Sequence, residues 1–175
     1  MKKIFFLAPL MALLLFVGCK KIDQLLTFTV DTSESVVIPG LAGTTQLPKP
    51  VTVTTNSATS FSNNKTSKDK VKDVYLDQMV LTITSPSGAN FDFLDKLDVY
   101  INTPNTNNKI LLATTPATVP RGVNTIKLVP TTARLDEYLK ADTYQLTVDA
   151  TTNRFSASDF TVRADSRFKV TANPL

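Results

Sequence analysis

The sequence contains few residues whose side chains could carry chemistry. It has no His and a single Cys among 175 residues. The absence of His removes the usual general base and the commonest metal ligand, and one Cys allows neither an intrachain disulfide nor a clustered zinc site. A serine could be activated only by a lysine, and Ser67 and Lys68 are neighbours in a polar segment rather than a buried pair. We therefore expect no enzyme and no cofactor.

Three aspartates recur at every third position, and carboxylate oxygens are ligands that calcium prefers. They are Asp92, Asp95 and Asp98. The segment lacks the spacing and the glycine pivot of an EF-hand loop, so we interpret it as a solvated turn in which Asp95 closes the approach to a strand at Leu97. The sequence leaves a weak calcium site open but assigns no metal ligand.

Cys19 stands at the end of a signal-like segment. Lysines follow the first methionine, residues 4–17 are apolar apart from Pro9, and Gly18 precedes the cysteine. This order of charged, apolar and small residues is the layout of a secretory signal. The apolar run is about 21 Å long as a helix, whereas a membrane span needs about 20 residues. Cleavage is therefore favoured over a membrane anchor, and the position argues against the alternative of a buried free thiol.

The run Phe16-Val17-Gly18-Cys19 resembles the lipobox of bacterial lipoproteins, with Phe16 in place of the more usual Leu. The resemblance implies that residues 1–18 are removed as a signal peptide and that Cys19 is lipidated with diacylglyceryl and palmitate-type chains. Residues 19–24 then form a short tether and residues 25–175 a single domain. Two acyl chains meet the requirement for stable membrane anchoring.

The net charge gives no support to nucleic-acid binding. Removing Lys2 and Lys3 with the signal lowers the formal charge from +4 to +2, so the high isoelectric point partly reflects the signal peptide rather than a basic binding face.

The remaining chain alternates apolar and polar residues with a period of two, which is the pattern of half-buried strands. The apolar positions are Leu26, Phe28 and Val30; Val51 and Val53; Met79, Leu81 and Ile83; Leu97, Val99 and Ile101; Ile126 and Leu128; and Tyr144, Leu146, Val148 and Ala150. Threonine fills many of the alternate positions and suits the outer face of a sheet because it is β-branched and polar.

The C-terminal run has the strongest pattern. From Phe160 to Ala172 one parity is apolar except for Ser166. A strand of this length spans about 43 Å, longer than most single strands. We expect a bend or bulge near Asp165-Ser166, or a strand shared between two sheets.

Two segments depart from the strand pattern. Leu135, Tyr138 and Leu139 have the spacing of one short helix, after a possible cap at Thr132, placed as a crossover between two late strands. Residues 56–70 are polar, and we expect an exposed loop that leads into a helical turn over residues 68–75.

These patterns predict an all-β fold, an antiparallel sandwich of seven to nine strands with one short helix. The helical crossover resembles that of immunoglobulin-like sandwiches, although the missing Cys–Trp–Cys core excludes the antibody type. The runs 80–86 and 88–94 and the closing Ala172-Asn173-Pro174-Leu175 resemble small Bacteroidota lipoproteins with immunoglobulin-like sandwiches. The resemblance implies a fold and a cell-envelope location but no activity. Lys20-Lys21 departs from the acidic export signal of that phylum, which favours an outer-membrane anchor facing the periplasm.

The expected function is that of a non-enzymatic, membrane-tethered envelope lipoprotein that binds or organises a protein partner, since a sandwich offers edge strands and end loops. The alternative is a glycan-binding accessory lipoprotein of an uptake system, for which Tyr75 and Tyr100 are the candidate platform residues. A pilus or adhesin subunit is a third possibility. The identity of the partner is unknown from the sequence.

Overall fold

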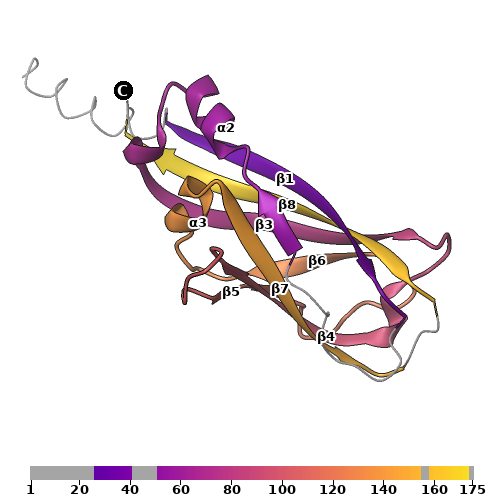
Figure 1. The fold of residues 1–175 in the computed structure, drawn as a ribbon. Helices are drawn as coiled ribbons and strands as arrows, with labels where there is room; N and C mark the ends of the chain where they lie inside the picture. Colours follow the sequence, from indigo (N-terminus) through magenta and orange to yellow (C-terminus); the bar gives the residue numbers. More distant parts are fainter. Residues whose placement is uncertain (1–25, 41–50, 155–157, 174–175) are drawn as a thin grey trace, which may run out of the picture.

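The computed structural model describes residues 26–40, 51–154 and 158–173. Within these ranges the chain forms eight strands and two α-helices (Figure 1). The elements are β1 (Thr27–Ile38), β2 (Val51–Thr54), α2 (Ser57–Asn63), η1 (Lys68–Lys70), β3 (Val71–Ser85), η2 (Phe91–Phe93), β4 (Leu94–Asn102), β5 (Ile110–Thr114), β6 (Thr125–Pro130), α3 (Asp136–Lys140), β7 (Thr143–Thr152) and β8 (Phe160–Ala172).

Every strand pairs antiparallel with its neighbours, in the order β1-β8-β3-β6-β5-β4-β7-β2. The first four strands form one layer and the last four the other. The layers are continuous only through the two residue pairs that join β5 to β6, so the sheet folds over onto itself (Figure 1). The predicted all-β, antiparallel architecture is confirmed.

The strand order also defines how the chain is wound. β1 pairs with β8, β2 with β7, β3 with β6 and β4 with β5, which is what one long antiparallel ribbon gives when it is rolled up. Eight strands arranged in this way in two sheets form a jelly roll. The order differs from the ABED and CFG sheets of an immunoglobulin sandwich, so the strand order does not support the immunoglobulin-like part of the expectation.

The core lies between the two layers and consists of the apolar residues that alternate along the strands in the sequence. Met79, Leu81 and Ile83 of β3 are buried, as are Leu97, Val99 and Ile101 of β4. Pairs of aromatic rings link the layers. The ring of Tyr144 on β7 meets that of Phe168 on β8 edge-on at 6.3 Å.

The irregularity expected in the C-terminal strand lies in its neighbour instead. β8 pairs with β1 over twelve consecutive residues without a register shift, so the predicted bulge at Asp165-Ser166 and the sharing between two sheets are wrong. β3 carries the shifts, one of them between Leu76 and Gln78, opposite Phe168 and Arg167. The extra residues bend β3 around the core, as bulges do, and this lets β8 stay regular. Ser166 keeps the buried parity, at 5% exposure.

The helices correct two further expectations. α3 lies where predicted and buries Tyr138 and Leu139, but its N-cap residue is Leu135, not Thr132. Residues 56–70 are not an open loop, because α2 forms there and buries Phe61, whose ring packs against Phe28 at 6.1 Å. The expected helical turn over 68–75 is only the short η1, after which β3 begins. None of the helices in the described ranges is long and apolar enough to cross a membrane.

We predict that Phe168→Ala destabilises the protein by about 3–5 kcal/mol, since it leaves a cavity at the contact between the layers. Phe168 is fully buried, whereas Val37 on the outer face of β1 is 59% exposed. Val37→Ala is the matched control and should stay within about 0.5 kcal/mol of the parent protein. Urea denaturation followed by circular dichroism measures both, and similar values for the two variants would contradict the assignment of the core.

Candidate functional site

The two ends of the folded sheet leave a seam. No described strand pairs with the outer edge of β1 from Phe28 to Ile38, and β2 covers β7 only from Thr143 to Leu146. Beyond Leu146 the outer edge of β7 has no strand partner among the described residues. Unpaired strand edges of this kind are templates for another strand.

The free edges of β1 and β7 run in the same direction. Six antiparallel pairings separate β1 from β7 in the strand order, and an even number of reversals restores the direction. A strand that is antiparallel to β7, as β2 is, is therefore antiparallel to β1 as well. One added strand has the right direction to pair with both edges.

The backbone of β7 presents hydrogen-bonding groups to this seam. The amide of Thr55 donates to the carbonyl of Asp142 at 2.9 Å, in the register that pairs β2 with β7. In an antiparallel pair, alternate residues point their N–H and C=O groups to the same neighbour. Val148 and Ala150 continue the parity of Asp142, Tyr144 and Leu146, so their backbone groups face the seam.

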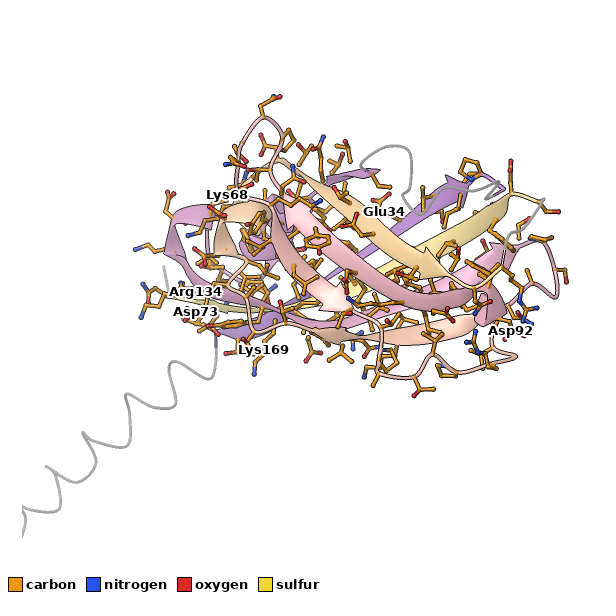
Figure 2. All side chains as sticks on the ribbon, turned by 90° about the horizontal axis from the view of Figure 1, so that it is seen from below. Glu34, Lys68, Asp73, Asp92, Arg134 and Lys169 are labelled. Carbon is orange, nitrogen blue, oxygen red and sulfur yellow. The ribbon has the colours of Figure 1, made fainter. Side chains whose placement is uncertain are left out.

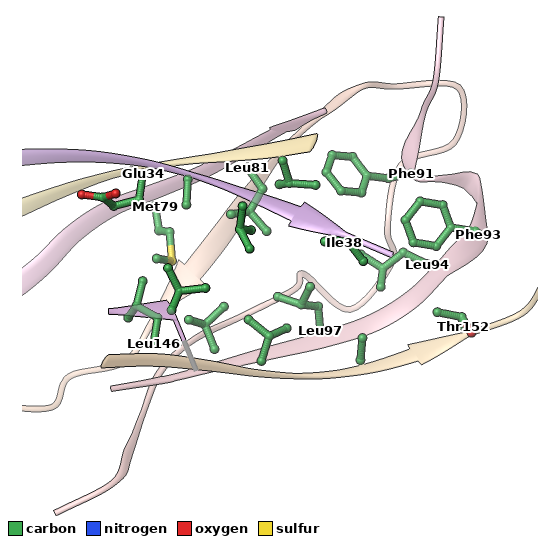
Figure 3. Close-up of a pocket in the computed structure, with 17 residues that line it drawn as sticks. Glu34, Ile38, Met79, Leu81, Phe91, Phe93, Leu94, Leu97, Leu146 and Thr152 are labelled. Atoms are coloured by element: carbon green, nitrogen blue, oxygen red, sulfur yellow. The ribbon is translucent and has the colours of Figure 1, made fainter. Parts of the chain in front are cut away.

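A cleft between the two layers opens at the seam (Figure 3). Its lining is almost wholly apolar and includes Val36 and Ile38 of β1, Met79 and Leu81 of β3, Leu97 and Val99 of β4, Val148 and Ala150 of β7, and Val162 and Ala164 of β8. The cavity has a volume of about 80 Å³. Apolar side chains that cover its lining would remove apolar surface from water, which is worth about 25 cal/mol per Å².

One end of the cleft is polar. Glu34 on β1 lines it, at the end opposite Phe91 and Phe93 (Figure 3). Two residues earlier on the same face, the Thr32 hydroxyl shares a hydrogen bond of 3.3 Å with the hydroxyl of Tyr144. Burial, with a smaller contribution from the negative charge of Glu34, raises the pKa of Tyr144 from 10.0 to about 12. The phenol therefore stays neutral beside the carboxylate.

The other end is closed by aromatic rings. Phe93 of η2 stacks on Phe160 of β8 at 5.0 Å and lies 6.2 Å from Phe91. Arg121 holds this turn, because its guanidinium donates to the backbone carbonyls of Asp92 and Leu94. Arg121 therefore fixes the turn that carries the aromatic rings at this end of the cleft.

The structure separates the three aspartates of the calcium hypothesis. An Asp92 carboxylate oxygen accepts from the amide of Gly122 at 2.6 Å. Asp95 accepts from Asn153 at 2.6 Å and from Arg121 at 3.1 Å, and these bonds lower its pKa.

Asp98 lies on the outer face of β4, where Lys96 and Thr114 bind its two carboxylate oxygens at 2.7 and 2.6 Å and lower its pKa. In the part of the chain that the structure describes, no three His, Cys, Asp or Glu residues gather as a metal site. Figure 2 shows Asp92 at one end of the molecule, Lys68, Asp73 and Arg134 at the other, and Glu34 between them.

The tyrosines proposed as a glycan platform do not form one surface. Tyr75 is on the outer face of β3 and 38% exposed, whereas Tyr100 is on the outer face of β4, in the opposite layer. The ammonium of Lys109 lies 4.5 Å from the centre of the Tyr100 ring and covers part of that face. The predicted lipidation site, Cys19, lies outside the described residues.

Sequence reasoning missed Glu34. The apolar alternation of the first predicted strand stops at Val30. The alternation resumes at Val36 and Ile38, and Thr32 and Glu34 share its parity. The signal for Glu34 in the sequence was therefore two polar residues at positions that are otherwise apolar along one long strand.

Comparison with known proteins gives little further information. No protein-family model matches the chain, and no curated protein sequence matches it. A structure from turnip yellow mosaic virus is similar over 86% of this chain and 95% of its own, at 12% identity and a TM-score of 0.28. Structures from Desmodium yellow mottle tymovirus and mud crab tombus-like virus cover 85% of this chain, at 10% and 8% identity and TM-scores of 0.27 and 0.29. They cover 89% and 82% of their own chains. Similarities at these TM-scores carry no argument about this chain.

We predict a late ionisation of Tyr144, with a pKa near 12, in an alkaline titration followed by the ultraviolet absorbance of tyrosinate. Because the folded pKa is raised, the stabilisation linked to it is complete below pH 10 and is lost as the pH rises through about 12. Tyr144→Phe should remove this step and Tyr75→Phe should leave it. Glu34→Gln should lower the pKa of Tyr144, and an unchanged titration in that variant would contradict the proximity of the two groups.

Proposed function

We propose that the protein is a lipid-anchored binding module of the bacterial cell envelope, which captures an extended segment of a protein partner at the seam between β1 and β7. The observation that carries the proposal is the seam itself, in which two strand edges with the same direction, unpaired among the described residues, flank an apolar cleft.

The seam fits the chemistry of strand addition. In that mode the main chain of the guest supplies hydrogen bonds to a sheet edge, and alternate side chains enter pockets. Val148 and Ala150 offer the backbone groups on one side. The apolar cleft receives inward-facing guest side chains, and the outward-facing ones remain in solvent.

The expected lipid anchor is compatible with access to the seam. A tether over 19–24 reaches at most about 20 Å, so the start of β1 stays close to the membrane. Glu34 is seven residues beyond Thr27 on β1, which is about 23 Å at 3.3 Å per residue. The cleft extends from Glu34 away from the anchored end, so a partner in the adjacent compartment can reach it.

The envelope part of the proposal predicts that Cys19→Ala abolishes lipidation. The variant should migrate as the uncleaved precursor and should carry no acyl chains. The fraction that sediments with membranes should therefore fall. Ser33→Ala, on the exposed face of β1, is the control and should be processed like the parent. Mature size and membrane sedimentation that do not respond to Cys19→Ala would contradict a lipoprotein.

The binding part of the proposal predicts site-specific crosslinking on intact cells. A photo-crosslinking amino acid at Val148, in the cleft, should give a discrete protein adduct, whereas the same group at Val129, 49% exposed on β6, should not. Mass spectrometry of the adduct should locate the crosslink in one extended segment of the partner.

A cleft-filling substitution provides the specificity test. Ala164→Leu enlarges a side chain on the β8 side of the cleft and should remove the Val148 adduct while the protein stays folded by circular dichroism. An adduct that persists in this variant, or one that forms equally at Val129, would exclude the seam as the binding site.

A further inference from the structure

We propose that the captured segment carries apolar side chains at alternate positions along the seam and, at its carboxyl end, a lysine or arginine directed at Glu34. This inference rests on the proposed function and specifies the chemistry of the partner.

The carboxylate of Glu34 is the unmatched charge of the cleft. Glu34 is half-buried, lines a cavity whose other lining residues are apolar except for Thr152, and has no hydrogen-bond or ion-pair partner in the described structure. Two acidic residues on the outer face of the same layer have ion-pair partners: Asp31 pairs with Arg167 at 2.8 Å and Asp165 with Arg163 at 2.9 Å. Covering Glu34 with an apolar strand would remove a carboxylate from water without compensation, which is unfavourable unless a cation accompanies it.

The position of the cation follows from the register across the seam. The Thr32–Tyr144 hydrogen bond brings the side-chain ends of these two residues together, and Figure 3 shows Glu34 and Leu146 at the same end of the cleft. Because β1 and β7 run in the same direction, Glu34 lies at the level of Leu146. Leu146 pairs with Val51, the first residue of β2, so Glu34 lies beside the point where the free edge of β7 begins.

A guest strand therefore has its first inward-facing position opposite Val148. That position is two residues, or about 7 Å along the strand, from the level of Glu34, within reach of a lysine or arginine side chain. The next inward positions face Ala150 and Thr152, beside Ile38 and Phe93. Since the guest runs antiparallel to β7, it reads apolar–x–apolar–x–cation from its amino end.

Synthetic peptides test this pattern on the full chain in detergent micelles. Two peptides share a Val-x-Val-x core and end in Lys or in Glu, and fluorescence anisotropy measures their affinities. We expect the Lys peptide to bind about tenfold more tightly than the Glu peptide. Glu34→Gln should reduce this preference to within about threefold, and Glu34→Lys should reverse it. Added salt should weaken the preference because the pair is only partly buried.

Asp31→Lys is the matched control. It makes the same change of charge on the same strand, but on the exposed outer face, and should leave the preference intact. If Asp31→Lys reverses the preference as Glu34→Lys does, the effect is one of net charge and the inference is overturned. If both peptides bind the parent protein equally well, the inference is overturned while strand capture stands. If neither binds and the Val148 crosslink is also absent, both proposals fail.

Two other occupants of the cleft, a segment of the same chain and a second copy of the protein, can be distinguished by experiment. Residues 41–50 connect β1 to β2, lie outside the described residues, and contain Lys49. If Lys49→Gln and Glu34→Gln lower the melting temperature equally, and the double variant lowers it no further, the cation comes from the chain itself and the proposal is overturned. A dimer in analytical ultracentrifugation that Glu34→Lys dissociates would overturn it in favour of a second copy.

Discussion

An antiparallel sheet of eight strands that folds over onto itself has two end strands, and the outer edge of each lacks the hydrogen-bonding partner that an inner strand has. In this protein the length of β2 determines how much of these edges is left unpaired. β2 has four residues, whereas β7 has ten and β1 has twelve. A short edge strand limits the surface on which other chains can pair, but it also leaves the edges of β1 and β7 without a described partner between the layers. The cleft, its polar end and the backbone groups on the β7 side all follow from this difference in strand length.

The cleft is a continuation of the core rather than a separate structure. Where β2 pairs with β7, inward-facing residues such as Val53 and Tyr144 are buried, and beyond β2 the inward-facing residues Val148 and Ala150 are half-buried. Stacked phenylalanines close one end, and Glu34 with the Thr32–Tyr144 pair closes the other. In the proposed capture, an apolar surface with a single carboxylate at its rim would distinguish guests by charge at one position and by shape at the others. That combination would give specificity through an electrostatic mismatch as well as through contact.

The sequence predicted the elements of this structure better than their arrangement. Period-two alternation identified seven of the eight described strands and their buried faces, because burial of one face requires that pattern. It did not identify β5, where Ile110 to Ala113 are all apolar. Strand order involves pairings between distant residues, such as Val36 with Val162, and no local pattern reports them. The register shifts of β3 were invisible for the same reason, since a bulge is defined by the strand opposite. α2 was missed because Phe61 is the single large apolar residue in a polar segment, and its ring packs against Phe28 from a strand. Glu34 was missed because the alternation of β1 is interrupted by two polar residues. Polar residues on the inward face of a strand matter here because they line the cleft, and the cleft exists only in the folded sheet.

The most direct test of the open seam is amide hydrogen exchange resolved to single residues along β7. If the seam is open, the amides of Val148 and Ala150 should exchange rapidly, whereas those of Thr147 and Asp149, which face β4, should be protected. Addition of a captured segment should then protect Val148 and Ala150. Equal protection of all four amides in the isolated protein would show that the edge is already covered and would contradict the account.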